Sequence, residues 1–463
     1  MSTSDAKFIT GSLMKHVSVM TFTASLGMIA LFAVDFVDMI FISMLGNAAL
    51  AAAVGYAGTI LFFTTSIGIG LSIAAGALVA RSIGQDNKDR AGEYATSVIV
   101  IGVVMALAVV AGMLYVLRDV LKGLGASGET LDLAQSYATI ILPSMPVILV
   151  AMIGGAVLRA HGDARRAMLT TLAGGIVNAV LDPLLIFGLD MGLQGAAVAS
   201  VFARFTILVT ALWPVIRVYD GLAAPKWAFI KRDVKDVSAI AGPAILANVA
   251  SPVGSAIMTR EMAKFGTDAV AAMAVIGRLT PVAFAVVFSL SGAIGPIVGQ
   301  NFGAGLNDRV RGGFYAALQF VVVYVVIVAA LLFLLRGSIA GLFEATGQTL
   351  ELIYLFCGPL ALLWIFNGWI FVGNASFNNL GHPFYSTWIN WGRATLGTWP
   401  PIYVCSAFWG ANGVLIGQAL GGVIFALFSV WLALRVMNKA IGATDAPEFL
   451  PHQRFHILHS RHH

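Results

Sequence analysis

The chain has 463 residues, of which 59% are hydrophobic and 11% are charged, whereas soluble globular domains contain roughly 45–50% apolar and about 25% charged residues. This composition excludes a soluble domain and predicts a protein embedded in a membrane along its whole length. The formal net charge of +5 is too small to predict a nucleic-acid partner. Fifty glycines without a ten-residue alternation favour a helical bundle over a β-barrel.

Stretches without a charged residue mark the membrane spans, because a charge at the bilayer centre costs about 2.5 kcal/mol or more. Several of these stretches are long enough for two helices joined by a turn, such as those at 45–47 and 409–412. The pattern predicts an all-α integral membrane protein with twelve transmembrane helices, which begin near residues 16, 50, 94, 132, 166, 193, 237, 269, 312, 351, 384 and 412.

Lysine and arginine residues gather in alternate loops between the predicted helices. If the N-terminus lies inside, 19 of the 27 basic residues fall in cytoplasmic segments, five in outer loops and three inside helices. Short cytoplasmic loops are rich in these residues, which predicts a multi-pass protein of the inner (cytoplasmic) membrane with both termini in the cytoplasm. The apolar stretch after Lys7 and Lys15 has no cleavage site and is predicted to remain as the first helix.

Landmark residues recur about 220 positions apart, which indicates an internal repeat. Asp89 pairs with Asp308, and Gly162 pairs with Gly381. Six helices per half is an even number, so both halves enter the membrane in the same direction and form a parallel repeat. The predicted organisation is an N-lobe of six helices (1–218), a cytoplasmic linker (219–236), a C-lobe of six helices (237–440) and a tail (441–463) whose histidines are typical of a vector or tag sequence.

Acidic residues inside predicted helices are the strongest functional signal, because a carboxylate is costly in the membrane. Asp35 and Asp38 lie on one face of the first helix, and Asp182 follows Asn178 by one turn in the fifth. The second half has no acid deep in a helix. Two carboxylates in a poorly hydrated site cannot both ionise cheaply, so one is expected to hold a proton and to change its hydrogen bonds with Asn178. The alternative is that these carboxylates hold helices together.

Three segments resemble the multidrug and toxic compound extrusion (MATE) family: 38–46 in the first helix, 158–163 after the fourth, and 178–183 in the fifth. Acids confined to the first lobe resemble the DinF-like branch, whereas the NorM-like branch usually has acids in helices 7 and 10. The resemblance implies a MATE-type fold of two six-helix lobes and export of small organic cations or amphipathic drugs across the lipid bilayer by a monomeric antiporter. Asp38, Asn178 and Asp182 match the coupling residues of the branch, and Asp35 is an additional acid whose role relative to Asp38 is open.

The coupling ion is predicted to be H⁺, because one carboxylate can carry a proton, while the alternative, Na⁺, needs several oxygen ligands at once. No cofactor or metal centre is expected, and the absence of a nucleophile–base constellation argues against an enzyme. The alternative function is a flippase for lipid-linked oligosaccharides or cell-wall precursors, which needs cavity arginines for an anionic diphosphate. The first half offers Arg204 alone, and Arg204, Arg278 and Arg393 are interpreted as packing partners in the first instance.

Overall fold

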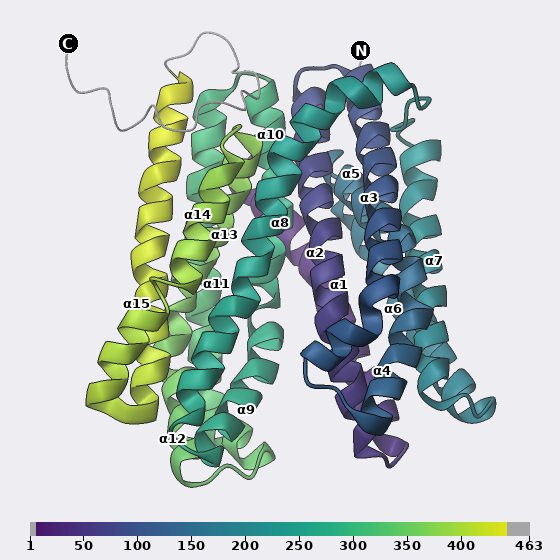
Figure 1. Cartoon of the computed structure of the whole chain (residues 1–463). Helices are drawn as coiled ribbons and strands as arrows, with labels where there is room; N and C mark the ends of the chain where they lie inside the picture. Colours follow the sequence, from purple (N-terminus) through teal and green to yellow (C-terminus); the bar gives the residue numbers. More distant parts are fainter. Residues whose placement is uncertain (1–5, 442–463) are drawn as a thin grey trace.

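The fold is a bundle of long helices arranged in two halves (Figure 1). A computed structural model of the chain describes residues 6–441, and every regular element in that range is helical. The first half contains the short turns η1 (Leu142–Ser144) and η2 (Leu184–Gly188) and the helices α1 (Leu13–Met44), α2 (Ala48–Gly84), α3 (Lys88–Gly123), α4 (Gly128–Ile141), α5 (Met145–Ala160), α6 (Ala164–Pro183) and α7 (Gly192–Arg217).

The second half begins with α8, a long helix that starts beside the first half and slants down into the second (Figure 1). Because α8 begins at Trp227, the later part of the predicted linker is helical and continuous with the first span of this half. The elements are α8 (Trp227–Ala263), α9 (Thr267–Ala283), α10 (Ala285–Gly303), α11 (Asn307–Leu342), α12 (Gly347–Leu355), η3 (Phe356–Leu360), α13 (Trp364–Asn379), α14 (Pro383–Ala394) and α15 (Trp399–Ile441).

The described helices account for the predicted membrane crossings. Ten runs are long and apolar enough to cross a membrane, and the pair formed by 347–360 and 364–379, bent by 59°, adds an eleventh. One of the ten, Pro383–Lys439, has 57 residues, whereas a single crossing needs about 20. Within it α15 breaks at Gly410, and the chain doubles back so that Gly413 packs on the backbone of Cys405. This run therefore crosses twice, and the predicted all-α membrane fold is confirmed.

Apolar cores lie inside each half. The first half has two clusters, one built mainly on α2, α3 and α5 and the other on α2, α4 and the start of α7, and the second half has one large cluster. Many large apolar side chains also lie on the outside of the bundle, including Phe36, Trp213 and Phe408. Such an exterior would be unfavourable in water but is suited to contact with lipid chains.

The two halves meet in a contact with two-fold symmetry. A Cβ atom on Gly84 of α2 would lie 2.1 Å from the carbonyl oxygen of Gln300, and one on Gly303 of α10 would lie 2.1 Å from that of Arg81. Gly84 and Gly303 are 219 positions apart, and so are Arg81 and Gln300. Equivalent residues of the repeat are thus in reciprocal contact, as a two-fold axis requires. Glycine at both places lets the two helices touch backbone to backbone.

An arginine of each half also binds the beginning of the other half. Arg90 of α3 donates from Nη1 to Oδ1 of Asp233 in α8 at 2.8 Å. Arg309 of α11 donates from Nη2 to three backbone carbonyl oxygens within residues 8–11, just before α1, at 2.9–3.1 Å. Arg90 and Arg309 are again 219 positions apart. These contacts tie the halves together at the upper end of the bundle in Figure 1.

Candidate functional site

Close packing of α1 on α6 creates the candidate site in the first half. A Cβ atom on Gly175 of α6 would lie 2.9 Å from Cγ2 of Val34 in α1, so the absence of a side chain at Gly175 permits this approach. Asp38 follows Val34 by one helical turn, and Asn178 follows Gly175 by three residues. The contact between the helices therefore brings the side chains of Asp38 and Asn178 together.

The amide of Asn178 bridges the two acidic residues. Its Nδ2 atom donates to Oδ1 of Asp38 at 3.0 Å and to Oδ2 of Asp182 at 2.8 Å. The two carboxyl groups also lie close enough to interact directly. The structure thus brings together three of the four residues that the sequence predicts for the site, from two helices that are about 140 residues apart in the chain.

Burial differs between the members of this cluster. The side chain of Asp182 is 0% exposed and Asn178 is 5% exposed, whereas Asp38 is half-buried. Oδ1 of Asp182 is buried and has no hydrogen-bond partner among the described residues. An unpaired carboxylate oxygen in such a place is costly, and a proton, a water molecule or a bound cation would relieve the cost. The arrangement is suited to exchange of small positive charges.

The backbone changes directly after Asp182. Pro183 has no N–H group, α6 ends at this residue, and the chain continues as the π-helical turn η2. A turn of this kind leaves the regular hydrogen-bond pattern and is frequent at functional sites. The sequence Asp182–Pro183 thus places the deepest carboxylate of the site at a discontinuity of the helix.

Tyr137, which was not predicted from the sequence as a site residue, also lies near the two carboxyl groups. Tyr137 of α4 is 8% exposed, interacts electrostatically with both carboxylates, and shares a hydrogen bond with Ser200 of α7. Arg204 of α7 also interacts electrostatically with Tyr137 and donates from Nη1 to Oγ of Ser144 at 2.9 Å. A tyrosine in an apolar helix has no distinctive sequence signal, because the sequence does not show whether its side chain faces the acidic residues or another helix.

Asp35, the fourth predicted site residue, lies in α1 one turn before Asp38. Its side chain is outside the part of the chain whose side chains the structure describes, so its role relative to Asp38 stays a prediction. Among the described residues, no group of three or more histidine, cysteine or acidic side chains could hold a metal ion. The predicted histidine-rich tail lies outside the described residues.

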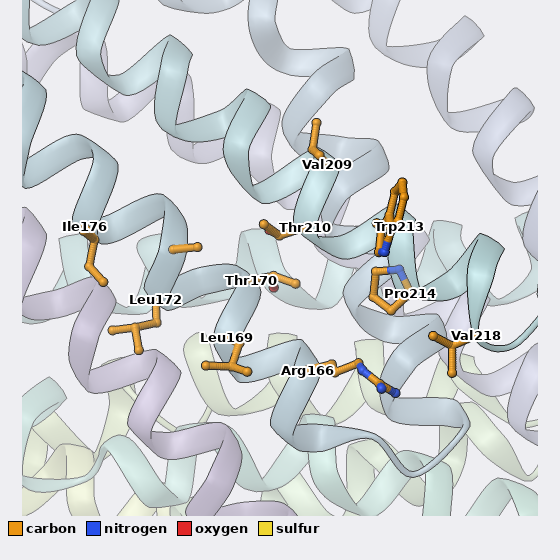
Figure 2. Close-up of a pocket in the computed structure, with 11 residues that line it drawn as sticks. Arg166, Leu169, Thr170, Leu172, Ile176, Val209, Thr210, Trp213, Pro214 and Val218 are labelled. Atoms are coloured by element: carbon orange, nitrogen blue, oxygen red, sulfur yellow. The ribbon is translucent and has the colours of Figure 1, made fainter.

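A separate groove of about 530 Å³ lies between α6 and α7, away from the acids (Figure 2). Apolar side chains line most of it, including Leu172, Ile176 and Trp213, and Arg166 marks one end. The same apolar residues are exposed on the outside of the bundle. This groove therefore faces the lipid and is distinct from the interior acid cluster.

A bundle of two repeated six-helix halves with an acid cluster in its interior is the architecture of a secondary membrane transporter. A profile of the MatE family matches residues 24–184 and 243–404 of this chain. The two matched ranges begin 219 residues apart, which agrees with the repeat seen in the sequence and in the contact between the halves. The chain belongs to the MATE family, and it is a multi-pass membrane transporter rather than an enzyme.

Relatives and solved structures agree with this assignment over nearly the whole chain. The FAD transporter of Shewanella oneidensis is 28% identical over 433 residues, which are 90% of this chain and 94% of that protein. The multidrug export protein MepA of Staphylococcus aureus is 23% identical over 412 residues, with 87% and 89% covered. The crystal structure of the Vibrio cholerae MATE transporter VcmN superposes with a TM-score of 0.86 at 25% identity, covering 93% of this chain and 97% of that one.

Proposed function

We propose that this protein is a proton-coupled antiporter that exports organic cations or amphipathic drugs across the cytoplasmic membrane by alternating access. The observation that carries the proposal is the bridge from Asn178 to Asp38 and Asp182 between two membrane-spanning helices. Intramembrane carboxylates are costly and are typical of proton relays and cation sites. The similarity to a multidrug export protein supports the substrate class.

Protons and a cationic substrate would compete for the same negative cluster. When both carboxylates are ionised, they repel one another, and a proton or an organic cation relieves the repulsion. Protonation of either one turns one of its oxygens into an O–H donor and weakens the group as an acceptor for the Asn178 amide. Because Asp38 lies in α1 and Asp182 in α6, each change in charge alters the attraction between these two helices.

The coupling ion can be tested in proteoliposomes that contain the purified protein and a fluorescent cation such as rhodamine 123. A proton gradient in sodium-free buffer is expected to accelerate transport of the dye, and a sodium gradient at constant pH is not. If sodium alone drives transport, the assignment to protons is wrong. If neither gradient changes the rate, the proposed antiport is wrong.

Export of a flavin nucleotide is the second candidate function. The relative named as an FAD transporter covers 90% of this chain at 28% identity, a higher identity than that of the multidrug export protein. Release of FAD from loaded proteoliposomes under the same gradients separates the two candidates. Faster gradient-driven transport of FAD than of the cationic dye would favour the flavin.

A further inference from the structure

An arginine without an acidic partner lies inside a membrane crossing of the second half. Arg393 of α14 donates from Nη1 to Oδ1 of Asn367 in α13 at 2.6 Å. Its Nε–H group is buried and has no hydrogen-bond partner among the described residues, and no described carboxylate interacts with it. A buried charge with so little compensation is unfavourable unless a ligand supplies negative charge or water molecules hydrate the guanidinium.

Aromatic side chains flank Arg393 and Asn367 on one face of α13. Trp364, Asn367, Phe371 and Asn374 follow one another at spacings of three or four residues, so they share that face. All four are half-buried. Oδ1 of Asn374 is buried and unpaired within the described part of the chain, so the face offers a free acceptor as well as the donors of Arg393.

Phe288 of α10 completes an aromatic wall. Its ring centroid lies 5.6 Å from that of Trp364 and 5.7 Å from that of Phe371. Trp364 is stacked in parallel on the fully buried Phe284 at 4.4 Å, which fixes the orientation of its ring. Rings held in this way offer flat apolar surface to another aromatic group without a further loss of side-chain freedom.

This wall lies beside the contact between the two halves. Phe288 and Gly292 are four residues apart on α10 and therefore share a face. A Cβ atom on Gly292 would lie 3.6 Å from Nε of Arg159, which belongs to α5 of the first half. No described acidic group interacts with Arg159 either. A second uncompensated guanidinium thus approaches the same region from the opposite half.

We propose that the second half carries a binding site for an aromatic anion, with the ring on Trp364, Phe288 and Phe371 and the carboxylate or phosphate on Arg393. The planar guanidinium of arginine matches such acidic groups by paired hydrogen bonds. Asn367 orients Arg393, and Arg159 adds positive charge at the edge of the site. This inference rests on the proposed function for the transport of its ligand, but binding itself requires no gradient.

Two dyes that differ in one acidic group test the site. Rhodamine 110 carries a free carboxylate, and rhodamine 123 is its methyl ester. Fluorescence anisotropy measures the binding of each dye to the protein in lipid nanodiscs at a pH where the carboxylate is ionised. We expect Arg393→Gln to weaken binding of rhodamine 110 by about tenfold, because a charge-assisted hydrogen bond is lost, and to leave rhodamine 123 unchanged. Arg393→Lys, which keeps the charge, should retain part of the affinity.

Arg311→Gln is the matched control, because Arg311 is an exposed arginine of α11 outside this site. The control should bind both dyes like the wild type. The inference is wrong if the wild type does not bind rhodamine 110, or if Arg393→Gln weakens both dyes equally or neither. Folding of Arg393→Gln is checked separately by its thermal unfolding temperature. If this variant does not fold, Arg393→Lys decides, and equal weakening of both dyes by Arg393→Lys contradicts the site. Failure of gradient-driven transport with intact selective binding would instead contradict the proposed function.

Discussion

At the scale of single residues, one amide group bridges the two acids of the first-half site. Asn178 can donate two hydrogen bonds through Nδ2, and the two acceptors are the carboxyl groups of Asp38 in α1 and Asp182 in α6. The two acids differ in their environment, because Asp182 is fully buried and Asp38 is half-buried. The sequence predicted this trio because polar residues in apolar helices are conspicuous, whereas Tyr137 was missed because its position facing the acids follows from helix packing.

Asp182→Asn should keep the protein folded and reduce gradient-driven dye transport by at least about tenfold, because the variant retains the shape but cannot exchange a proton. The same is expected of Asp38→Asn. Transport in proteoliposomes, corrected for the amount of inserted protein, provides the measurement. Asp163→Asn is the control, since Asp163 lies in the loop before α6 and Asn also caps helices well. Full activity of either acid variant would contradict the role assigned to that acid.

Asp163 gives a pH-dependent contribution to stability. Burial disfavours its ionised form, but hydrogen bonds from the backbone N–H of Arg166, the Tyr219 hydroxyl and the Arg166 guanidinium outweigh burial and lower the pKa. A group with a lowered pKa stabilises the fold above its unfolded value, about 3.9 for Asp, and loses this contribution as pH falls through the folded value.

Asp163→Ala should therefore cost about 0.5–2 kcal/mol near neutral pH through loss of the helix cap and its partners. The difference from the wild type should shrink as the pH falls below about 4. Thermal unfolding in detergent across this pH range measures the effect. A difference that grows in acid would mean that Asp163 does not contribute through its ionised form.

At the scale of helices, glycine residues determine where two helices can come into close contact. Gly175 admits Val34 and so sets the distance between α1 and α6, and the pair Gly84 and Gly303 sets the crossing of α2 and α10. Glycine is abundant throughout this sequence, and in membranes small residues at helix contacts replace the hydrophobic effect as the means of close packing. Which of the 50 glycines act in this way could not be predicted, because each contact depends on the rotation of two helices.

Gly84→Ala should separate α2 from α10, because its Cβ atom would overlap the carbonyl oxygen of Gln300, which belongs to the backbone and cannot rotate away. We expect a lower thermal unfolding temperature than in the wild type, with a loss in the range of about 1–3 kcal/mol that is typical of overpacking. Gly112→Ala in α3 is the matched control, because nothing lies within 4 Å of a Cβ atom there. Equal unfolding temperatures of the two variants would contradict the close contact.

In the whole molecule, the two halves share a repeated arrangement of helices but differ in their buried charged residues. By the offset of 219 residues, Asp182 corresponds to Pro401, and Arg393 corresponds to Gly174. Among the described residues, the pair of buried carboxyl groups thus belongs to the first half, and the arginine beside the aromatic wall belongs to the second. Motion of one half against the other would change the distance between these opposite charges, which connects substrate and ion binding to the overall conformation.

The orientation of the bundle can be tested with two cysteines at the ends of one helix in a background without Cys357 and Cys405. Asp89→Cys and Lys122→Cys lie at opposite ends of α3, both exposed and about 50 Å apart at 1.5 Å per residue. A membrane-impermeant maleimide should label Lys122→Cys in intact cells and Asp89→Cys after permeabilisation. The reverse pattern would contradict the cytoplasmic location predicted for both termini from the basic residues.

The sequence by itself determined the class of protein, the membrane crossings, the repeat and the acidic residues of the first half. These features follow from solvent preference and spacing along one chain, because a membrane penalises every charge and rewards each apolar stretch of sufficient length. The tertiary structure decided which polar groups meet. The bridge from Asn178, the approach of Tyr137, and the aromatic wall beside Arg393 depend on helix rotation, crossing angle and glycine contacts, which are set by packing between segments distant in the sequence.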